Sequence, residues 1–159
     1  MKLIFLDIDG VLNCKYSKSR IPNSNIIGID DDKVELLKKI IDSCDEECRI
    51  ILTSSWKHSW YKKDKSNQNK DANYLDEKLN KYNLKIYDKT IDESWNRGRG
   101  IRDYLDNCKE DISNFIVLDD NIFKDYEEEK IMDYLILTDI LHGLIDYFVD
   151  KAIEKLNKK

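Results

Sequence analysis

Residues Lys2 to Asn13 read KLIFLDIDGVLN, and this stretch decides the fold that we predict for the chain. An apolar run leads directly into Asp7 and Asp9, and Gly10 follows at once. A short, continuous run of β-forming residues is typical of a strand that is buried on both faces, as in a parallel sheet. Open α/β sheets place their ligand sites at the carboxyl ends of such strands.

Asp7 and Asp9 share one side of the predicted strand, because side chains alternate with a period of two. Two neighbouring carboxylates repel each other, and a hard cation such as Mg²⁺, which takes carboxylate oxygens, would relieve that repulsion. The alternative is a polar strand end whose aspartates only cap a turn. The attachment of the pair to a short apolar strand and to Gly10 favours a functional site.

Two further apolar runs end in polar side chains in the same way. They are residues 49–52, which lead into Thr53 and Ser54, and residues 114–118, which lead into Asp119 and Asp120. Small hydroxyls and free backbone amides at a strand end can hold phosphate oxygens. In a parallel sheet the three strand ends lie side by side, so the sequence predicts one shared site.

Arg97 and Arg99 stand at a glycine-bearing helix start between the second and third of these ends. They can place a cation near an anion; the alternative is surface charge among glycine turns. Residues 14–29 are a predicted irregular flap with basic side chains, which either meets an anionic substrate or is a solvated loop.

Residues 57–63 interleave basic and aromatic side chains, a mixture that can stack nucleobases and contact phosphates. The alternative is a solvated loop with amphipathic anchors. His58 within it could be a general acid or a substrate contact, although a lone loop histidine is more often neither.

The remaining elements are predicted from periodicity and turn residues. We expect helices over residues 30–41, 72–82, 97–105 and 141–156, strands over 84–87 and 133–138, a loop over 90–95, and a solvated acidic run over 125–130.

Length and composition limit the class of protein. The 159 residues predict a single domain over 1–159, and 41% hydrophobic residues suffice for one core. The net charge of −5 argues against broad, non-specific nucleic-acid binding, although not against a local basic patch. We expect no membrane span and no signal peptide. The four cysteines show no zinc spacing, which predicts free thiols and a cytoplasmic location.

The motifs, in this order, resemble those of the haloacid dehalogenase (HAD) superfamily, whose members are mostly magnesium-dependent phosphatases. The matching segments are FLDIDGVL at residues 5–12, ILTS at 51–54, Arg97 or Arg99 ahead of a helix, and VLDD at 117–120. The order and spacing agree over about residues 1–140.

Four further details resemble a small group of nearly capless proteins within the superfamily, some of whose relatives are linked to nucleic-acid repair. They are GVLN at residues 10–13, TSSW at 53–56, Arg97-Gly98-x-x-Ile101, and Gly143-Leu144. This likeness favours Arg97 over Arg99.

The resemblance implies a role for each matching carboxylate. Asp7 is the nucleophile that attacks phosphorus and forms an aspartyl-phosphate. Asp9 is the general acid for the leaving oxygen and then the base that activates water, and its backbone carbonyl contacts the metal. Asp119 and Asp120 complete a Mg²⁺ site with Asp7 and Asp9.

The resemblance also implies the groups that hold the phosphate. Thr53, with Ser54 beside it, binds the phosphoryl oxygens, and Arg97 or Arg99 stabilises their charge. The presence of Asp9 favours hydrolysis of a phosphate ester, because members that are not phosphatases often vary there.

The implied fold is a Rossmann-like three-layer α/β/α sandwich with a mainly parallel sheet and no full cap domain, since too few residues separate the motifs to hold one. An open site suits a large substrate or needs a partner as a lid. We therefore predict a Mg²⁺-dependent phosphohydrolase that acts on a nucleic-acid end or a nucleotide. The alternatives are a small-metabolite phosphatase and a non-catalytic HAD-like binding or regulatory module.

Overall fold

The computed structural model describes residues 1–92 and 95–158. Its centre is a five-stranded sheet in the order β3-β2-β1-β4-β5, and each neighbouring pair is parallel. The strands are β1 (Lys2–Leu6), β2 (Cys48–Leu52), β3 (Ile86–Lys89), β4 (Asn114–Asp119) and β5 (Leu135–Leu137). The predicted parallel α/β fold is confirmed.

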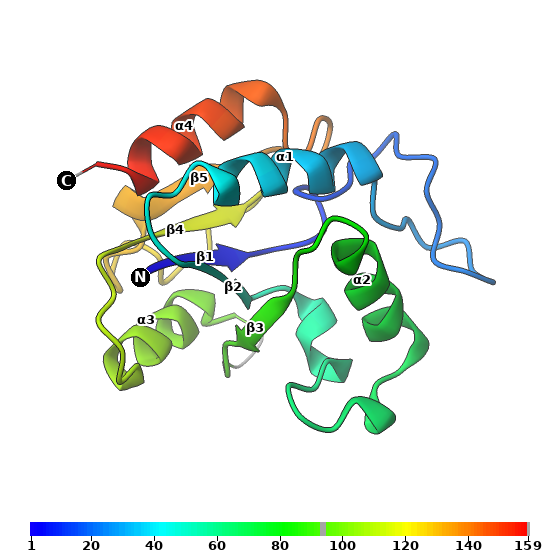
Figure 1. The fold of residues 1–159 in the computed structure, drawn as a ribbon, viewed down its shortest axis with the longest axis horizontal. Coiled ribbons are helices and arrows are strands. Elements are labelled where there is room, and N and C mark those ends of the chain that lie inside the picture. Colours follow the sequence, from blue (N-terminus) through cyan, green and yellow to red (C-terminus); the bar gives the residue numbers. More distant parts are fainter. Residues whose placement is uncertain (93–94, 159) are drawn as a thin grey trace.

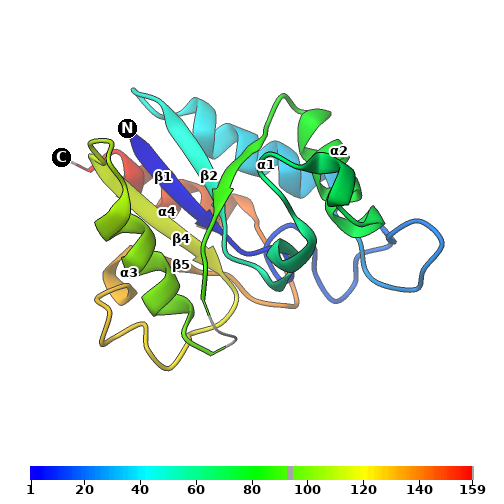
Figure 2. The ribbon, with the colours of Figure 1, turned by 90° about the horizontal axis from the view of Figure 1, so that it is seen from below.

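Helices cover both faces of the sheet (Figures 1 and 2). On one face lie α1 (Asp31–Asp42), α2 (Lys70–Asn80) and α4 (Asp146–Leu156), and on the other lies α3 (Arg97–Asn107). Short 3₁₀ turns span Ser55–Ser59, Lys65–Asn67 and Met132–Tyr134. The architecture is therefore the predicted three-layer α/β/α sandwich.

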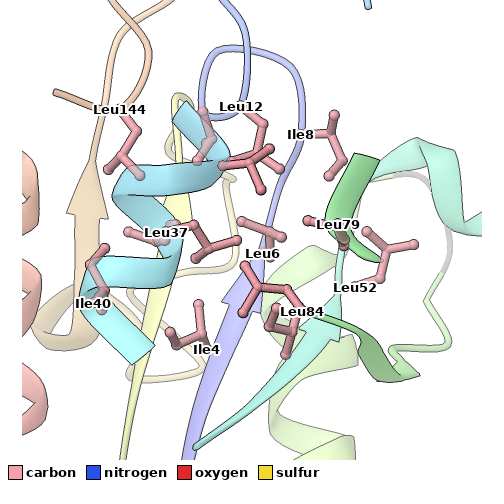
Figure 3. Packing of buried hydrophobic residues seen from close by; sticks show 14 of the residues in the cluster. Ile4, Leu6, Ile8, Leu12, Leu37, Ile40, Leu52, Leu79, Leu84 and Leu144 are labelled. Carbon is pink, nitrogen blue, oxygen red and sulfur yellow. The ribbon is translucent and has the colours of Figure 1, made fainter. Parts of the chain in front are cut away.

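Strand β1 packs on both of its faces, which explains its unbroken apolar sequence. Ile4 and Leu6 lie in the core beneath α1, while Leu3 and Phe5 pack towards α3. Figure 3 shows Ile4 and Leu6 beside Leu37 of α1. Full burial of one such side chain stabilises the fold by roughly 1.5–3 kcal/mol.

The predicted helix over residues 141–156 begins later than expected, at Asp146. Residues before it form a turn in which Gly143 has a φ of +63° and lies so close to Asn13 that an added Cβ would be 2.5 Å from its carbonyl oxygen. Leu144 enters the core directly from this turn, while Leu141 stays 44% exposed. Some of the apolar residues whose spacing predicted a helix therefore lie in the turn before α4.

Other boundaries differ by about two residues. Helix α2 starts at Lys70 because the Asn69 side chain accepts hydrogen bonds from the amides of Asp71 and Ala72. The strands expected over 84–87 and 133–138 are β3 and β5, the latter preceded by a 3₁₀ turn. Within the loop expected over 90–95, residues 93 and 94 lie outside the described residues.

The flap over residues 14–29 is more ordered than predicted. Arg20 and Ile27 form an antiparallel bridge, and the amide of Ile21 donates to the carbonyl of Ile26 at 3.0 Å. The amide of Ile29 donates to the Tyr74 hydroxyl of α2 at 3.0 Å, which fixes the base of the flap. In Figure 1 the flap extends past the ends of α1 and α2.

Among the described helices, none has both the length and the apolar character that a membrane span requires. The cysteines at positions 14, 44, 48 and 108 are free thiols.

Candidate active site

The carboxyl ends of β1 and β4 meet at the point where the strand order of the sheet reverses. Leu6 pairs with Leu118, so Asp7 and Asp119 follow at the same level of the sheet. The amide of Asp7 donates to the carbonyl of Leu118 at 2.9 Å, which continues the ladder beyond the strand. Ligands bind in the crevice at such a reversal in open α/β folds.

Three carboxylates gather in this crevice. Asp7, Asp119 and Asp120 each offer an oxygen, and these oxygens all lie within 4.8 Å of one another. Gly10 makes the approach possible, because an added Cβ there would lie 2.2 Å from an Asp120 carboxylate oxygen. The glycine that follows Asp9 therefore leaves room for the third carboxylate of the cluster.

The cluster is short of positive charge. Burial is the main cause that raises the pKa of Asp7 to about 6; Arg97 opposes the shift, and the charge of Asp119 adds to it. Burial also raises the pKa of Asp119 and of Asp120. Carboxylate oxygens held this close are the donors that Mg²⁺ prefers, so these residues fit the predicted ion.

Arg97 lies in the site and Arg99 does not. Nη1 of Arg97 is 2.7 Å from Oδ2 of Asp119 and 3.2 Å from Oδ2 of Asp7. Burial lowers the pKa of Arg97, but Asp7 and Asp119 outweigh burial and raise it. Arg99 is 60% exposed and pairs with Asp103. Of the two candidates, the structure places only Arg97 beside the proposed nucleophile.

The first turn of α3 explains the sequence Arg97-Gly98-Arg99-Gly100. The Asp125 carboxylate accepts the amides of Gly98 at 3.1 Å and Arg99 at 2.8 Å, so it caps the helix from another segment. An added Cβ on Gly98 would lie 3.0 Å from that carboxylate. The acidic run over 125–130 was predicted to be solvated, and this is wrong for Asp125, which is only 7% exposed.

Thr53 presents an unpaired hydroxyl. The residue is 1% exposed, and its Oγ1 has no hydrogen-bond partner among the residues that the structure describes. Such a buried group costs about 1–3 kcal/mol, which a ligand oxygen would recover. Thr53 and Arg97 both line a hollow of about 160 Å³, which we call the phosphate hollow. His58 and Ser55 line it as well.

Ser54 has a different position. It is 1% exposed, its hydroxyl lowers the pKa of the Asp7 carboxyl, and it accepts a hydrogen bond from the amide of Trp56 at 3.3 Å. Ser54 thus supports Asp7 instead of lining the phosphate hollow.

Asp9 is held apart from the acidic cluster. Its Oδ2 accepts a hydrogen bond from Nε1 of Trp56 at 3.1 Å, and its Oδ1 accepts one from Nδ2 of Asn13 at 2.9 Å. Asn13 in turn accepts the amide of Gly10 at 2.9 Å. The Asp9 carboxylate therefore points to Trp56, which leaves its main-chain carbonyl for the metal contact that the resemblance implies.

Several residues without a role predicted from the sequence shape the site. Trp56 and Asn13 orient Asp9, and the hydroxyl of Tyr126, a fully buried residue, donates to Oδ2 of Asp119 at 2.8 Å. A tyrosine inside an acidic run was the only available signal for Tyr126.

The basic and aromatic stretch over residues 57–63 is largely part of the packing. Trp60 is 1% exposed and donates its Nε1 to Asp76 at 2.9 Å. Lys57 is buried and pairs with Asp92. Trp60 is therefore too buried to stack on a base as predicted. The exposed His58, by contrast, lines the phosphate hollow.

A parallel α/β sheet with an Asp-x-Asp pair after its central strand, a second acidic pair after β4, and a threonine and an arginine beside them defines a HAD-type, phosphatase-like domain. The model of the HAD domain in Swiss Army Knife RNA repair proteins matches residues 3–149, and the chain belongs to this family. Searches of curated proteins and of solved structures gave no significant match.

Proposed function

We propose that this protein is a Mg²⁺-dependent phosphohydrolase that removes a phosphate from a polynucleotide end or a nucleotide. One observation carries the proposal: the Asp7 carboxylate lies beside Arg97, at 3.2 Å, and beside two further carboxylates. Thr53, whose hydroxyl has no partner among the described residues, lines the adjoining hollow. A nucleophile, a cation and a free hydroxyl donor are the groups that phosphoryl transfer needs.

In the first half of the reaction an oxygen of Asp7 attacks phosphorus. The new bond forms as the bond from phosphorus to the leaving oxygen breaks, and Asp9 gives its proton to that oxygen. Arg97 balances the charge on the transferring group and Thr53 donates to one of its oxygens. The products of this half are an aspartyl-phosphate on Asp7 and an alcohol.

In the second half Asp9, now a carboxylate, takes a proton from a water molecule. The water oxygen bonds to phosphorus, and the bond from phosphorus to Asp7 breaks. Free phosphate leaves and the Asp7 carboxylate is restored. The two hydrogen bonds from Trp56 and Asn13 hold Asp9 in one orientation for both proton transfers.

Asp7, Asp119, Asp120 and the carbonyl of Asp9 would hold the Mg²⁺ ion. When bound, the ion neutralises negative charge on the nucleophile and on the phosphoryl group. The raised pKa values of the carboxylates support this assignment, because the cluster lacks sufficient positive charge of its own.

Two features support a polynucleotide end as the substrate. The family description refers to RNA repair proteins. In addition, the insertion after β1 is only the short flap, and that after β2 contains α2, whose Leu75 and Leu79 are buried in the core. These insertions are built into the domain and are too small to form a cap domain.

The proposal is tested by phosphate release from the purified protein with and without Mg²⁺. We expect Mg²⁺-dependent release from oligonucleotides with 3′- or 5′-phosphates, and loss of activity by at least about a thousandfold in Asp7→Asn, which keeps the shape but not the nucleophile. Asp103→Asn, on the exposed side of α3, is the matched control and should keep full activity.

The rival functions give different results in the same assay. A clear preference for free sugar phosphates over oligonucleotides would favour a small-metabolite phosphatase. A protein inert towards the whole panel, with Mg²⁺ present, would favour a non-catalytic binding module. Full activity in Asp7→Asn would contradict the assignment of the nucleophile.

A further inference from the structure

A second hollow adjoins the site on the side of the flap and has a volume of about 220 Å³. We call it the flap hollow. Its walls include Ile21 and Ile26 of the flap, Ser55 and Trp56 after β2, and Asn69 and Asp71 at the start of α2. Ser55 lines both this hollow and the phosphate hollow, so the two are neighbours.

We propose that the flap hollow binds the nucleobase of the nucleotide whose phosphate is removed. This inference rests on the proposed function, since it assigns the leaving group of that reaction. It adds a base-binding subsite, made largely by the flap and the start of α2, to a site otherwise assembled around a phosphate.

The position of Asp9 identifies the hollow as the leaving-group side. The proton donor must lie next to the leaving oxygen, and Asp9 is the proposed donor. Trp56 joins the two places, because its Nε1 donates to Asp9 at 3.1 Å while its side chain lines the flap hollow. A group attached to the leaving oxygen would therefore extend from Asp9 towards Trp56.

The apolar part of the wall suits a flat, aromatic ligand. Trp56 contributes an indole, and the flap contributes Ile21, which is 2% exposed, and Ile26, which is 57% exposed. Nucleobases stack on aromatic side chains whatever their sequence. A base stacked in the hollow would cover the exposed side chain of Ile26.

The polar part of the wall selects a neutral ligand with N–H donors. Oδ1 of Asp71 is buried and has no hydrogen-bond partner within the described part of the chain. An unpaired carboxylate oxygen accepts from the amino group of adenine, cytosine or guanine and repels a phosphate. Positive charge lies instead in the phosphate hollow, with Arg97. The flap hollow thus suits the base of a nucleotide, and the phosphate hollow suits its phosphate.

The first test measures binding without catalysis. Adenosine, which has no phosphate, is titrated into ¹⁵N-labelled protein while the indole N–H signals of its three tryptophans are followed. We expect the Trp56 signal to shift and the Trp60 signal to stay. Asp71→Ala and Ile26→Ser should each weaken adenosine binding about fivefold or more. Asp150→Asn, on the exposed side of α4, is the control and should bind as the wild type does.

Ile26 is exposed, so Ile26→Ser should fold normally and keeps the test valid if Asp71→Ala does not fold. A Trp56 signal that stays unchanged at millimolar adenosine would overturn the proposal. Unchanged adenosine affinity in Ile26→Ser and in folded Asp71→Ala would overturn it as well.

The second test uses turnover. Two oligonucleotides with the same terminal phosphate are compared, one with a terminal adenine and one abasic at that residue. We expect kcat/KM to be about tenfold lower for the abasic end. Equal values would overturn the base subsite while leaving the phosphohydrolase intact. If neither end releases phosphate, the proposed function fails, and the adenosine titration still decides whether the hollow binds a base.

Discussion

At the scale of single residues, the orientation of Asp9 depends on two donors that lie outside the proposed catalytic groups. Trp56 and Asn13 each give one hydrogen bond to its carboxylate. A carboxylate that first donates and then accepts a proton must stay aimed at the leaving oxygen and then at water. We therefore regard Trp56 as a positioning residue for Asp9 in addition to its place in the flap hollow.

Replacing Trp56 by phenylalanine removes the N–H donor and keeps an aromatic ring. We expect kcat for an aliphatic phosphomonoester to fall about tenfold, because a hydrogen bond to a charged group is lost, while KM changes little. Steady-state kinetics measure this split. Trp95→Phe is the matched control, since Trp95 is 72% exposed. A rise in KM at constant kcat would contradict the positioning role.

Tyr126 supports Asp119 in a similar way. Its hydroxyl donates to Oδ2 of Asp119 at 2.8 Å in a fully buried place. Tyr126→Phe should lower the free energy of unfolding by about 1–2 kcal/mol and weaken Mg²⁺ binding about tenfold or more, as the loss of a partner of a metal ligand does. Urea unfolding and calorimetric titration with Mg²⁺ measure the two effects, and Tyr134→Phe is a control. Unchanged Mg²⁺ affinity would show that Tyr126 only packs.

The residues that could be predicted from the sequence are those that follow a strand directly. Asp7, Thr53 and Asp119 come immediately after or at the end of apolar runs, so topology alone brings them together. Trp56 and Tyr126 could not be predicted, because the choice of their partners depends on how a turn and a loop fold back onto the sheet.

At the scale of elements, the start of α3 shows how a helix places the Arg97 guanidinium beside the acidic cluster. Asp125 caps the helix from the segment after β4, and this cap fixes the first turn that carries Arg97. Gly98 and Gly100 allow two carboxylates to approach the helix. A Cβ on Gly98 would meet Asp125, and a Cβ on Gly100 would meet Asp92. A sequence pattern can predict such a helix start, but it cannot show which distant acidic residue caps it.

Removing the cap tests this arrangement. Asp125→Ala should lower the free energy of unfolding by about 1–2 kcal/mol, as loss of a helix cap does, and lower activity further because Arg97 loses its support. Chemical unfolding and phosphate release measure both. Glu127→Ala, an exposed residue of the same acidic run, is the matched control and should change neither. Equal effects of the two variants would contradict the capping role.

At the scale of the whole molecule, the sheet order explains why distant motifs form one site. β1 lies between β2 and β4, so the polar residues after these three strands are neighbours although more than a hundred positions separate Asp7 from Asp119. The parallel sheet could be predicted because the central strands β1 and β4 consist largely of continuous apolar runs. The flap and the turn before α4 could not, since hydrogen bonds and close backbone contacts shape them more than periodicity does.

We expect the same convergence to make the stability of the protein depend on pH and on metal. The folded protein raises the pKa of Asp7 from 3.8 to about 6, mainly through burial. The folded state therefore binds a proton between these values that the unfolded state has lost. The free energy of unfolding of the metal-free protein should fall as pH rises through about 4 to 6, with an Asp7 contribution of about 3 kcal/mol.

Urea unfolding in EDTA at pH 4.5 and 7.5 measures this effect against Asp7→Asn, which cannot ionise at that position. We expect the variant to be more stable than the wild type at pH 7.5, with a smaller difference at pH 4.5, because only the wild type then carries the uncompensated charge. Saturating Mg²⁺ should raise the free energy of unfolding of the wild type at pH 7.5. It should have little effect at pH 4.5, where protons compete for the carboxylates. A wild type more stable than Asp7→Asn in EDTA at pH 7.5 would show that Arg97 alone balances the cluster, and that the site has no need of a cation.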